Sequence, residues 1–395
     1  MDFEHRYTKE QASFRQEVSS WLDSNIPDGF LSGSSPDITS GHYWNKYNVF
    51  RASIGSRGWL TPNQSLQHGG AGLTPDKTLV LVEEMERRSL LWVLDLGTSA
   101  LAATIRDFGT EYQRLESLPF LSKGEITLWY PANLDPSVEI GSSNLTASLN
   151  GDDFVLSGES ALYGYHPFPS HLWVIASTDY PVSGTNHTAA FLIPSNFKGL
   201  VFEEIDTLSQ APIHKVLCNE VWVPSICLIG KDIDDHSNFG SADNPQNIGT
   251  VPKDDDYVSD LINYANETPV SGQALIEHPI FKQLLMEIYT SNQVLRILKV
   301  RNSWMMSTGQ PMSYEKTQVT LLEKRHSQRL AQVTRDVMGI YALLDTEDGR
   351  SIMRGKALVQ QKRSLSVDNH YDYPDRESEE ITKHLGLGTT KSAST

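Results

Sequence analysis

The chain has 395 residues and a formal net charge of −16 at neutral pH. This length predicts two or three domains, and so acidic a surface argues against a nucleic acid as the main partner. No stretch reaches about 18 apolar residues and the charged start has no apolar core, so we expect no membrane span, no signal peptide and a cytoplasmic protein.

The first part of the chain has helical periodicity. Its first apolar stripe consists of Phe14, Val18, Trp21 and Leu22. Thr74 is a predicted N-cap with Pro75 at the first helical position, and the apolar run that follows residue 95 stops at Gly109. These patterns predict an N-terminal helical domain over residues 1–123.

From about residue 124 the apolar period changes to two, and β-branched and aromatic residues dominate, which is typical of strands. Asn150-Gly151 predicts a tight hairpin because both residues accept positive φ angles. Cys218 and Cys227 lie nine residues apart without a CxxC motif, so we expect free thiols rather than a zinc site or a disulfide framework. The segment predicts a middle antiparallel β domain over residues 124–235.

The last part of the chain returns to helical spacing. Residues 232–256 are polar, acidic and rich in Gly, Asn and Pro, which predicts a loop before the long helices. One apolar face comprises Phe281, Leu284, Leu285, Ile288, Val294, Leu295 and Leu298. Residues 236–395 are therefore predicted to form a C-terminal helical bundle with a flexible tail. Helices, strands and helices in this order indicate an α+β fold with segregated layers.

Four blocks of sequence occur in a characteristic order. They are Gly58-Trp59-Leu60 with GGAGLT at 69–74, NGDDFVLSG at 150–158, the strand pair at 200–223, and GQALIEHP at 272–279. In these blocks the chain resembles the acyl-CoA dehydrogenase family along nearly its whole length. The resemblance implies that family's fold, with an N-terminal helical domain, a middle antiparallel β domain and a C-terminal helical bundle.

The last block points to a subgroup. Its GxxLxxxP run is similar to the acyl-CoA dehydrogenases of bacterial steroid side-chain degradation. That resemblance implies an α2β2 assembly of two unlike subunits, with flavin sites at the unlike interface and the catalytic residues on one partner only. The apolar C-terminal helices, with Trp304, Met305 and Met306, independently predict a tetramer built through this bundle.

The base of the implied reaction is missing from its expected position. The family removes hydrogen from Cα and Cβ of an acyl-CoA thioester, which requires a base for the α-proton and FAD for the β-hydride. The family's glutamate lies in an (H/F)ERxxIG segment, which matches DNPQNIG at 243–249. Aligned on Ile-Gly, Asn244 replaces the glutamate and Pro245 the arginine. An amide does not accept a proton at pH 7. Asp243 remains as a displaced base, although a solvated loop carboxylate is the favoured interpretation.

The flavin-contact motifs are degraded as well. The TEPxxGSD loop corresponds to residues 132–139, where only Asp135-Pro136 matches. The GxKxWxT strand reads GESALY at 158–163, so Leu162 replaces the tryptophan. Tyr163, Tyr165 and His166 remain aromatic candidates, with packing at a strand end as an equally favoured role. Arg363 lies in an RSLS run similar to the family's RGSLSL, where it either reaches a diphosphate or forms a solvent-facing turn. The candidate cofactor contacts are Trp129, Tyr130, Asp135, Leu162, Tyr163 and Arg363.

Three degraded motifs on an intact scaffold predict that the catalytic residues lie on a partner chain. We expect one subunit of an FAD-dependent acyl-CoA dehydrogenase, paired with a second acyl-CoA dehydrogenase-like subunit that carries the base and shares or holds the FAD. Two alternatives stay open: a scaffold or acyl-ligand-binding homologue without flavin, and an active homotetramer with Asp243 as base. Acyl-CoA is the expected ligand, a ring-bearing acyl group is favoured by the subgroup alone, and no metal site is expected.

Overall fold

The computed structural model divides the chain into two compact units, residues 7–247 and residues 248–395 together with the first six. It describes residues 7–28, 30, 41–88, 90–132, 144–178, 188–205, 212–230, 255–270, 272–308, 310–344, 348–366 and 376–385. Most of the loop predicted at 232–256 and the tip of the predicted flexible tail lie outside these residues. The three-domain division at residues 123 and 235 stays a prediction.

The first unit opens with helices. They are α1 (Lys9–Asn25), α2 (Gly41–Ser56), α3 (Pro75–Arg87), α4 (Leu96–Phe108) and α5 (Glu111–Ser122). The helices α1 and α5 begin with capping boxes, in which the side chains of Thr8 and Thr110 accept from a backbone N–H one turn later. The predicted start of α3 at Pro75 after Thr74 and the end of α4 before Gly109 are confirmed.

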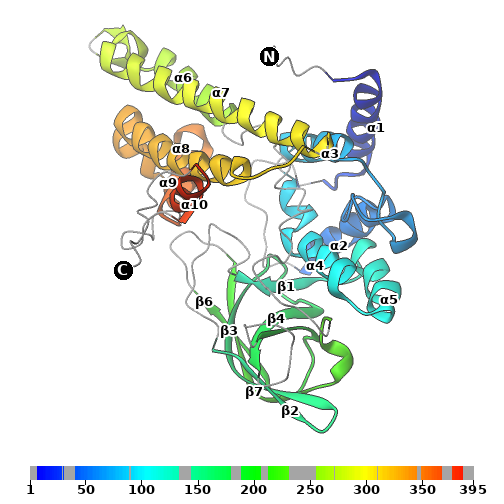
Figure 1. Cartoon of the computed structure of the whole chain (residues 1–395). Helices are drawn as coiled ribbons and strands as arrows, with labels where there is room; N and C mark the ends of the chain where they lie inside the picture. Colours follow the sequence, from blue (N-terminus) through cyan, green and yellow to red (C-terminus); the bar gives the residue numbers. More distant parts are fainter. Residues whose placement is uncertain are drawn as a thin grey trace, which may run out of the picture. The chain divides into compact units, whose positions relative to one another are not determined.

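The same unit contains one seven-stranded sheet (Figure 1). Its strands are β1 (Leu128–Pro131), β2 (Thr146–Asn150), β3 (Asp153–Tyr163), β4 (His171–Thr178), β5 (Thr188–Pro194), β6 (Leu200–Ile205) and β7 (Ile213–Val223). The strand order is β1-β4-β2-β3-β7-β6, with β5 beside β4 and a further pairing between β1 and β3. Most pairs are antiparallel as predicted, whereas β4 runs parallel to β1 and β2. The hairpin is confirmed, but its turn is shifted by one residue, because Asn150 ends β2 and pairs with Asp153. Gly151 and Asp152 form the turn, and of the residues from 150 to 153 only Gly151, at +67°, has a positive φ.

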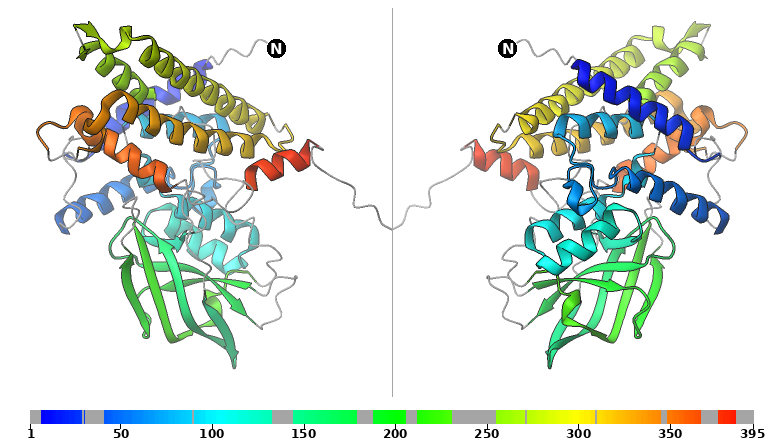
Figure 2. Two further views of the ribbon diagram at one scale, coloured as in Figure 1. Left: turned by 90° about the vertical axis from the view of Figure 1, so that its left-hand side faces the viewer. Right: turned by 90° about the vertical axis from the view of Figure 1, so that its right-hand side faces the viewer.

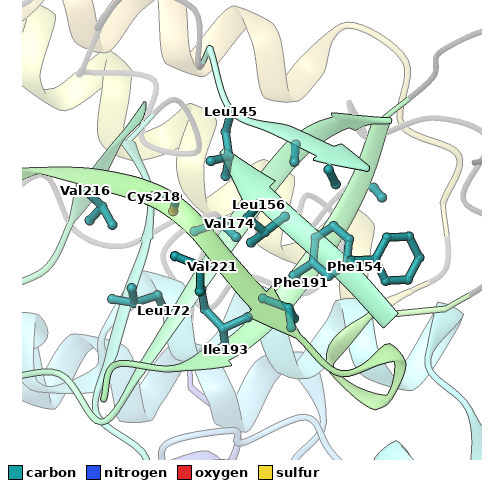
Figure 3. Packing of buried hydrophobic residues seen from close by; sticks show 14 of the residues in the cluster. Leu145, Phe154, Leu156, Leu172, Val174, Phe191, Ile193, Val216, Cys218 and Val221 are labelled. Atoms are coloured by element: carbon teal, nitrogen blue, oxygen red, sulfur yellow. The ribbon is translucent and has the colours of Figure 1, made fainter. Parts of the chain in front are cut away.

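The sheet buries apolar side chains on both of its faces. Figure 3 shows one cluster, in which Phe154, Leu172 and Phe191 come from three different strands. On the other face Tyr130 and Trp173 belong to a second cluster with Leu101 of α4 and Leu118 of α5. The helices α4 and α5 accordingly lie against one end of the sheet in Figure 2. The strand alternation of the sequence therefore serves two cores rather than one core and solvent.

Both cysteines are free thiols, as predicted, with Cys218 buried and Cys227 half-buried. Burial raises the pKa of each thiol to about 11. The reactive thiolate form is therefore scarce at neutral pH, and both residues serve packing.

The second unit is helical. Its helices are α6 (Asp255–Glu267), α7 (Pro279–Ser307), α8 (Glu315–Met338), α9 (Lys356–Ser366) and α10 (Arg376–His384), with a short ribbon of β8 (Pro269–Val270) and β9 (Gln273–Ala274). Leu285, Ile288 and Leu295 of α7 are buried as predicted. The prediction for Val294 is wrong, because its side chain is 46% exposed on the opposite face of the helix. Among the described residues, no helix is long and apolar enough to cross a membrane.

Candidate functional site

Four of the predicted cofactor-binding residues meet where β1 pairs with β3. Tyr130 lies opposite Tyr163 and Pro131 lies opposite Leu162. Because side chains alternate along a strand, Trp129 and Leu162 enter one core while Tyr130 and Tyr163 enter the other. All four residues are between 0% and 7% exposed. The three aromatic rings among them have no open face for an isoalloxazine ring. The role of all four residues as flavin contacts stays a prediction.

Trp129 fixes the loop that follows β3, residues 164–170. Its indole stacks face to face on His214 of β7, with ring centroids 3.8 Å apart and planes 2° apart. Indole Nε1 donates to the carbonyl oxygen of His166 at 2.7 Å, and His214 Nε2 lies 3.1 Å from the carbonyl oxygen of Gly164. A Cβ on Gly164 would lie 2.1 Å from Trp129 Cδ1. Two side chains from different strands thus hold the backbone of this loop.

The remaining predicted site residues are less well defined. Asp135, Asp243 and Asn244 lie outside the described residues. Arg363 lies on α9, but its side chain is outside the described part. Of the predicted site residues whose side chains the structure describes, Trp129, Tyr130, Leu162 and Tyr163 lie together. No group of three or more potential metal ligands occurs among the residues that the structure describes.

The loop after β3 brings a set of rings together that we call the aromatic cluster: Trp44 and Tyr47 of α2, Trp92, Tyr165 and His166. The ring centroids of Trp44 and His166 are 4.8 Å apart. Tyr47 stacks on Trp92 at 5.2 Å and 12°, and Trp92 meets Tyr165 at 6.1 Å. Tyr165 and His166 were aromatic candidates from the sequence, whereas the partners on α2 were missed. The spacing of Trp44, Tyr47 and Arg51 by three and four residues was the available signal.

A buried ion pair lies beneath these rings. Arg51 is 1% exposed and donates to the Val93 carbonyl at 3.2 Å and to Thr98 Oγ1 at 2.7 Å. Its counter-ion Asp95 is 3.9 Å away, caps α4 by accepting from the Gly97 N–H, and has φ +50°. Burial raises the pKa of Asp95, and burial also raises the pKa of Tyr47, which lies close to both charges. Burial lowers the pKa of His166, so its neutral form predominates at pH 7.

Comparisons with known proteins agree with the architecture. The models "Acyl-CoA dehydrogenase, N-terminal domain" and "Acyl-CoA dehydrogenase, C-terminal domain" match residues 8–125 and 255–360. Acyl-CoA dehydrogenase fadE12 of Mycobacterium bovis is 22% identical over 246 residues, so the chain spans 61% of that relative's length. Acyl-CoA dehydrogenase FadE26 of Mycobacterium tuberculosis is 20% identical over 370 residues, 89% of this chain and 90% of the relative.

Solved structures show the same fold. The ChsE4-ChsE5 complex from Mycobacterium tuberculosis superimposes with a TM-score of 0.76 at 18% identity, covering 98% of this chain and 99% of the other. The Tcur3481-Tcur3483 steroid ACAD gives 0.72 at 16% identity, with 98% and 99% covered. The two family models together span more than half of the chain, and the predicted fold class is confirmed. This chain belongs to the acyl-CoA dehydrogenase family.

Proposed function

We propose that this chain is the subunit without a catalytic base in a mixed, cytoplasmic, FAD-dependent acyl-CoA dehydrogenase tetramer. The observation that carries the proposal is Asn244-Pro245 in the motif where the family has glutamate and arginine. A neutral amide cannot remove the α-proton of a thioester, so the proton must pass to a residue of the second acyl-CoA dehydrogenase-like subunit. FAD, when bound, would accept the hydride from the β-carbon of the acyl-CoA.

The packing at β1 and β3 supports a cofactor held mainly by the partner. Leu162 is fully buried, and Trp129 is occupied on one face by His214. This chain's own described residues position backbone there: Trp129 and His214 hold the loop at residues 164–170. That a complex of two named chains is among the structures with this fold is consistent with a mixed assembly.

A second candidate is a scaffold or acyl-ligand-binding homologue without flavin. The same buried side chains favour it, because they fill the space beside β1 without a cofactor. Colour separates the two candidates. A lone chain that is colourless and turns yellow when a second acyl-CoA dehydrogenase-like subunit and FAD are added supports the mixed enzyme. A chain that stays colourless in the mixture supports the scaffold.

The decisive experiment is an electron-acceptor assay of the purified chain with added FAD and short, long and ring-bearing acyl-CoAs. We expect turnover at least about 10²-fold below that of a complete family enzyme, because a positioned base typically contributes 10²–10⁴ in rate. Asn244→Glu alone should not restore turnover, since Pro245 removes a backbone donor and fixes φ beside it. Robust turnover by the lone chain that Asp243→Asn abolishes would instead make Asp243 the base of an active homotetramer.

A further inference from the structure

The loop after β3 is fixed firmly at both of its ends. At its start the Gly164 N–H donates to the Pro212 carbonyl oxygen at 3.0 Å. At its end Ser170 and Thr127 exchange two hydrogen bonds, each from a backbone N–H to the other residue's hydroxyl oxygen, at 2.8 and 3.0 Å. Residues 165–168, which we call the strap, lie between these two anchors.

His166 holds the centre of the strap. Its carbonyl oxygen accepts from Trp129 Nε1 at 2.7 Å, and its ring centroid lies 4.8 Å from that of Trp44 and 6.0 Å from that of Tyr47. Its Nδ1 accepts from the Phe168 N–H at 3.1 Å. The residues on either side of Phe168 are prolines without an N–H, so no neighbouring amide can replace this donor.

The hydrogen bond to Phe168 requires a neutral imidazole. A ring nitrogen accepts only while it carries no proton, so Nε2 of His166 holds the proton of the neutral ring. This Nε2 atom is buried and has no hydrogen-bond partner among the described residues. A second proton, on Nδ1, would turn both ring nitrogens into donors. Nδ1 would then face the Phe168 N–H donor to donor, and Nε2 would still have no acceptor.

The surroundings of the ring also disfavour a positive charge on it. Burial is the largest effect on the pKa of His166 and lowers it, whereas the backbone of Phe168 raises it by less and the charge of Arg51 lowers it further. No carboxylate among the described residues forms an ion pair with His166. The titratable and charged groups on the neighbouring elements are Arg51 and Tyr47 of α2, Asp95 before α4, Tyr165 of the strap and, across Trp129, His214 of β7 and Glu204 of β6. A proton therefore binds the enclosed ring less readily than it binds an imidazole in water.

We propose that the strap is a pH-sensitive latch, in which protonation of His166 breaks its hydrogen bond to the Phe168 N–H and releases residues 165–168 from α2. The released imidazole reaches water, where it keeps the proton that the closed strap disfavours. The anchors hold, because His214 Nε2 donates to the Gly164 carbonyl whether or not its ring is charged, and the other anchors use backbone and hydroxyl groups. The strap lies within residues 7–247 and its release requires neither FAD nor a partner subunit, so its test is separate from that of the proposed dehydrogenase function.

The test is hydrogen exchange of the full chain, followed by mass spectrometry and corrected for the intrinsic effect of pH on exchange. We expect the protection of the Phe168 amide to fall about eightfold from pH 7 to pH 5.5, because proton uptake by an imidazole with a pKa near 6.5 favours the open strap by that factor. Strand amides of β3 and β7 should stay at least about 100-fold better protected at both pH values, which separates release of the strap from global unfolding.

His166→Asn should abolish the pH dependence of this amide, because an asparagine oxygen accepts from the N–H two residues later but does not titrate. The matched control is His42→Gln, which removes an exposed imidazole from α2 and should keep the eightfold change. The wild-type comparison needs no variant, so the test is decisive even if His166→Asn does not fold. Equal protection of the wild-type amide at both pH values, protection equal to that of the strands, or an eightfold change in His166→Asn would each overturn the proposal.

Discussion

Arg51 is a cation enclosed almost completely by the first unit. It carries three hydrogen bonds, to Thr98 and to the carbonyl oxygens of Val93 and Ile126, so it connects α2 with α4 and with the chain entering β1. A buried charge of this kind need not stabilise more than an apolar side chain of the same size would. Once its partners are buried around it, however, its removal leaves them unpaired.

Arg51→Met should therefore lower the free energy of unfolding by about 3–5 kcal/mol, because Asp95 loses its counter-ion while Thr98 and two carbonyl oxygens lose their donor inside the protein. Urea unfolding followed by circular dichroism measures the change. Arg57→Met is the control, since Arg57 pairs with Glu17 at the surface and such pairs contribute about 0–1 kcal/mol. Equal losses in the two variants would contradict the role assigned to Arg51.

Three histidines, in β4, in β7 and in the loop after β3, make the first unit sensitive to acid. Burial lowers the pKa of His166, His171 and His214 below the usual value near 6.5. The unfolded chain then binds more protons than the folded chain as pH falls below about 6.5, so stability falls with pH in that range. We expect a lower urea midpoint at pH 5.5 than at pH 7.

His214→Gln should reduce this pH dependence, because one of the three histidines with a lowered pKa is gone. Its Nε2 contact to Gly164 and the stack on Trp129 are lost as well, so stability at pH 7 should also fall. His42→Gln, at an exposed position of α2, serves as the control. The same difference between pH 5.5 and pH 7 in wild type and His214→Gln would show that His214 does not contribute.

At the scale of elements, the fit of α4 against β1 depends on one missing side chain. Gly97 lies in the first turn of α4, and a Cβ there would come within 2.0 Å of Tyr130 Cδ1. Alanine is the better helix former by about 1 kcal/mol, so local propensity alone would favour the substitution. The contact with Tyr130 acts against the substitution, because a methyl group there would overpack a filled core. Overpacking of this kind typically lowers stability by about 1–3 kcal/mol.

Gly97→Ala is thus expected to lower the melting temperature, whereas Gly41→Ala in the first turn of α2 should keep or raise it, since no atom lies within 4 Å of its Cβ position. Combining Gly97→Ala with Tyr130→Leu should cost less than the sum of the single changes, because the smaller side chain frees the space. Additive losses would mean that Tyr130 is not what excludes the methyl group.

At the scale of the whole molecule, α7 carries apolar side chains on the face opposite its core. Met286, Val294, Ile297 and Trp304 are exposed along it. A groove of about 550 Å³ adjoins this face between α7 and α8, and its lining includes Met286 and Val294 of α7 and Leu322 of α8. Exposed apolar side chains spread along one face of a long helix are typical of a protein interface.

Light scattering should accordingly give a mass well above the 44.2 kDa of one chain, in keeping with the predicted tetramer. Ile297→Glu should shift the mass toward the monomer, because a charge would be buried in the interface. Ile340→Glu is the control, as Ile340 is exposed on a different segment. A stable monomer of the wild type at micromolar concentration would refute assembly through α7.

The sequence by itself determined the features that depend on neighbouring residues. Caps, the Asn150-Gly151 hairpin and the apolar period of each segment are local signals, since they act within one turn of helix or one pair of strands. The four ordered blocks extended these signals to the fold and the family. The substitution at Asn244 is likewise visible in the sequence alone, because the loss of a carboxylate needs no coordinates to be recognised.

Only the tertiary structure decided which partners these elements meet. Alternation along β1 predicts that Trp129 and Tyr130 lie on opposite faces of the strand, but it does not predict that both faces are buried. The stack of Trp129 on His214 and the ion pair of Arg51 with Asp95 join residues far apart in the chain. These pairs form only because of the register of the strands and the packing of α2 against α4, which the sequence does not give directly. Val294 shows the same limit, because an apolar residue on a helix fits either an internal core or an external interface until the packing of the helix is fixed.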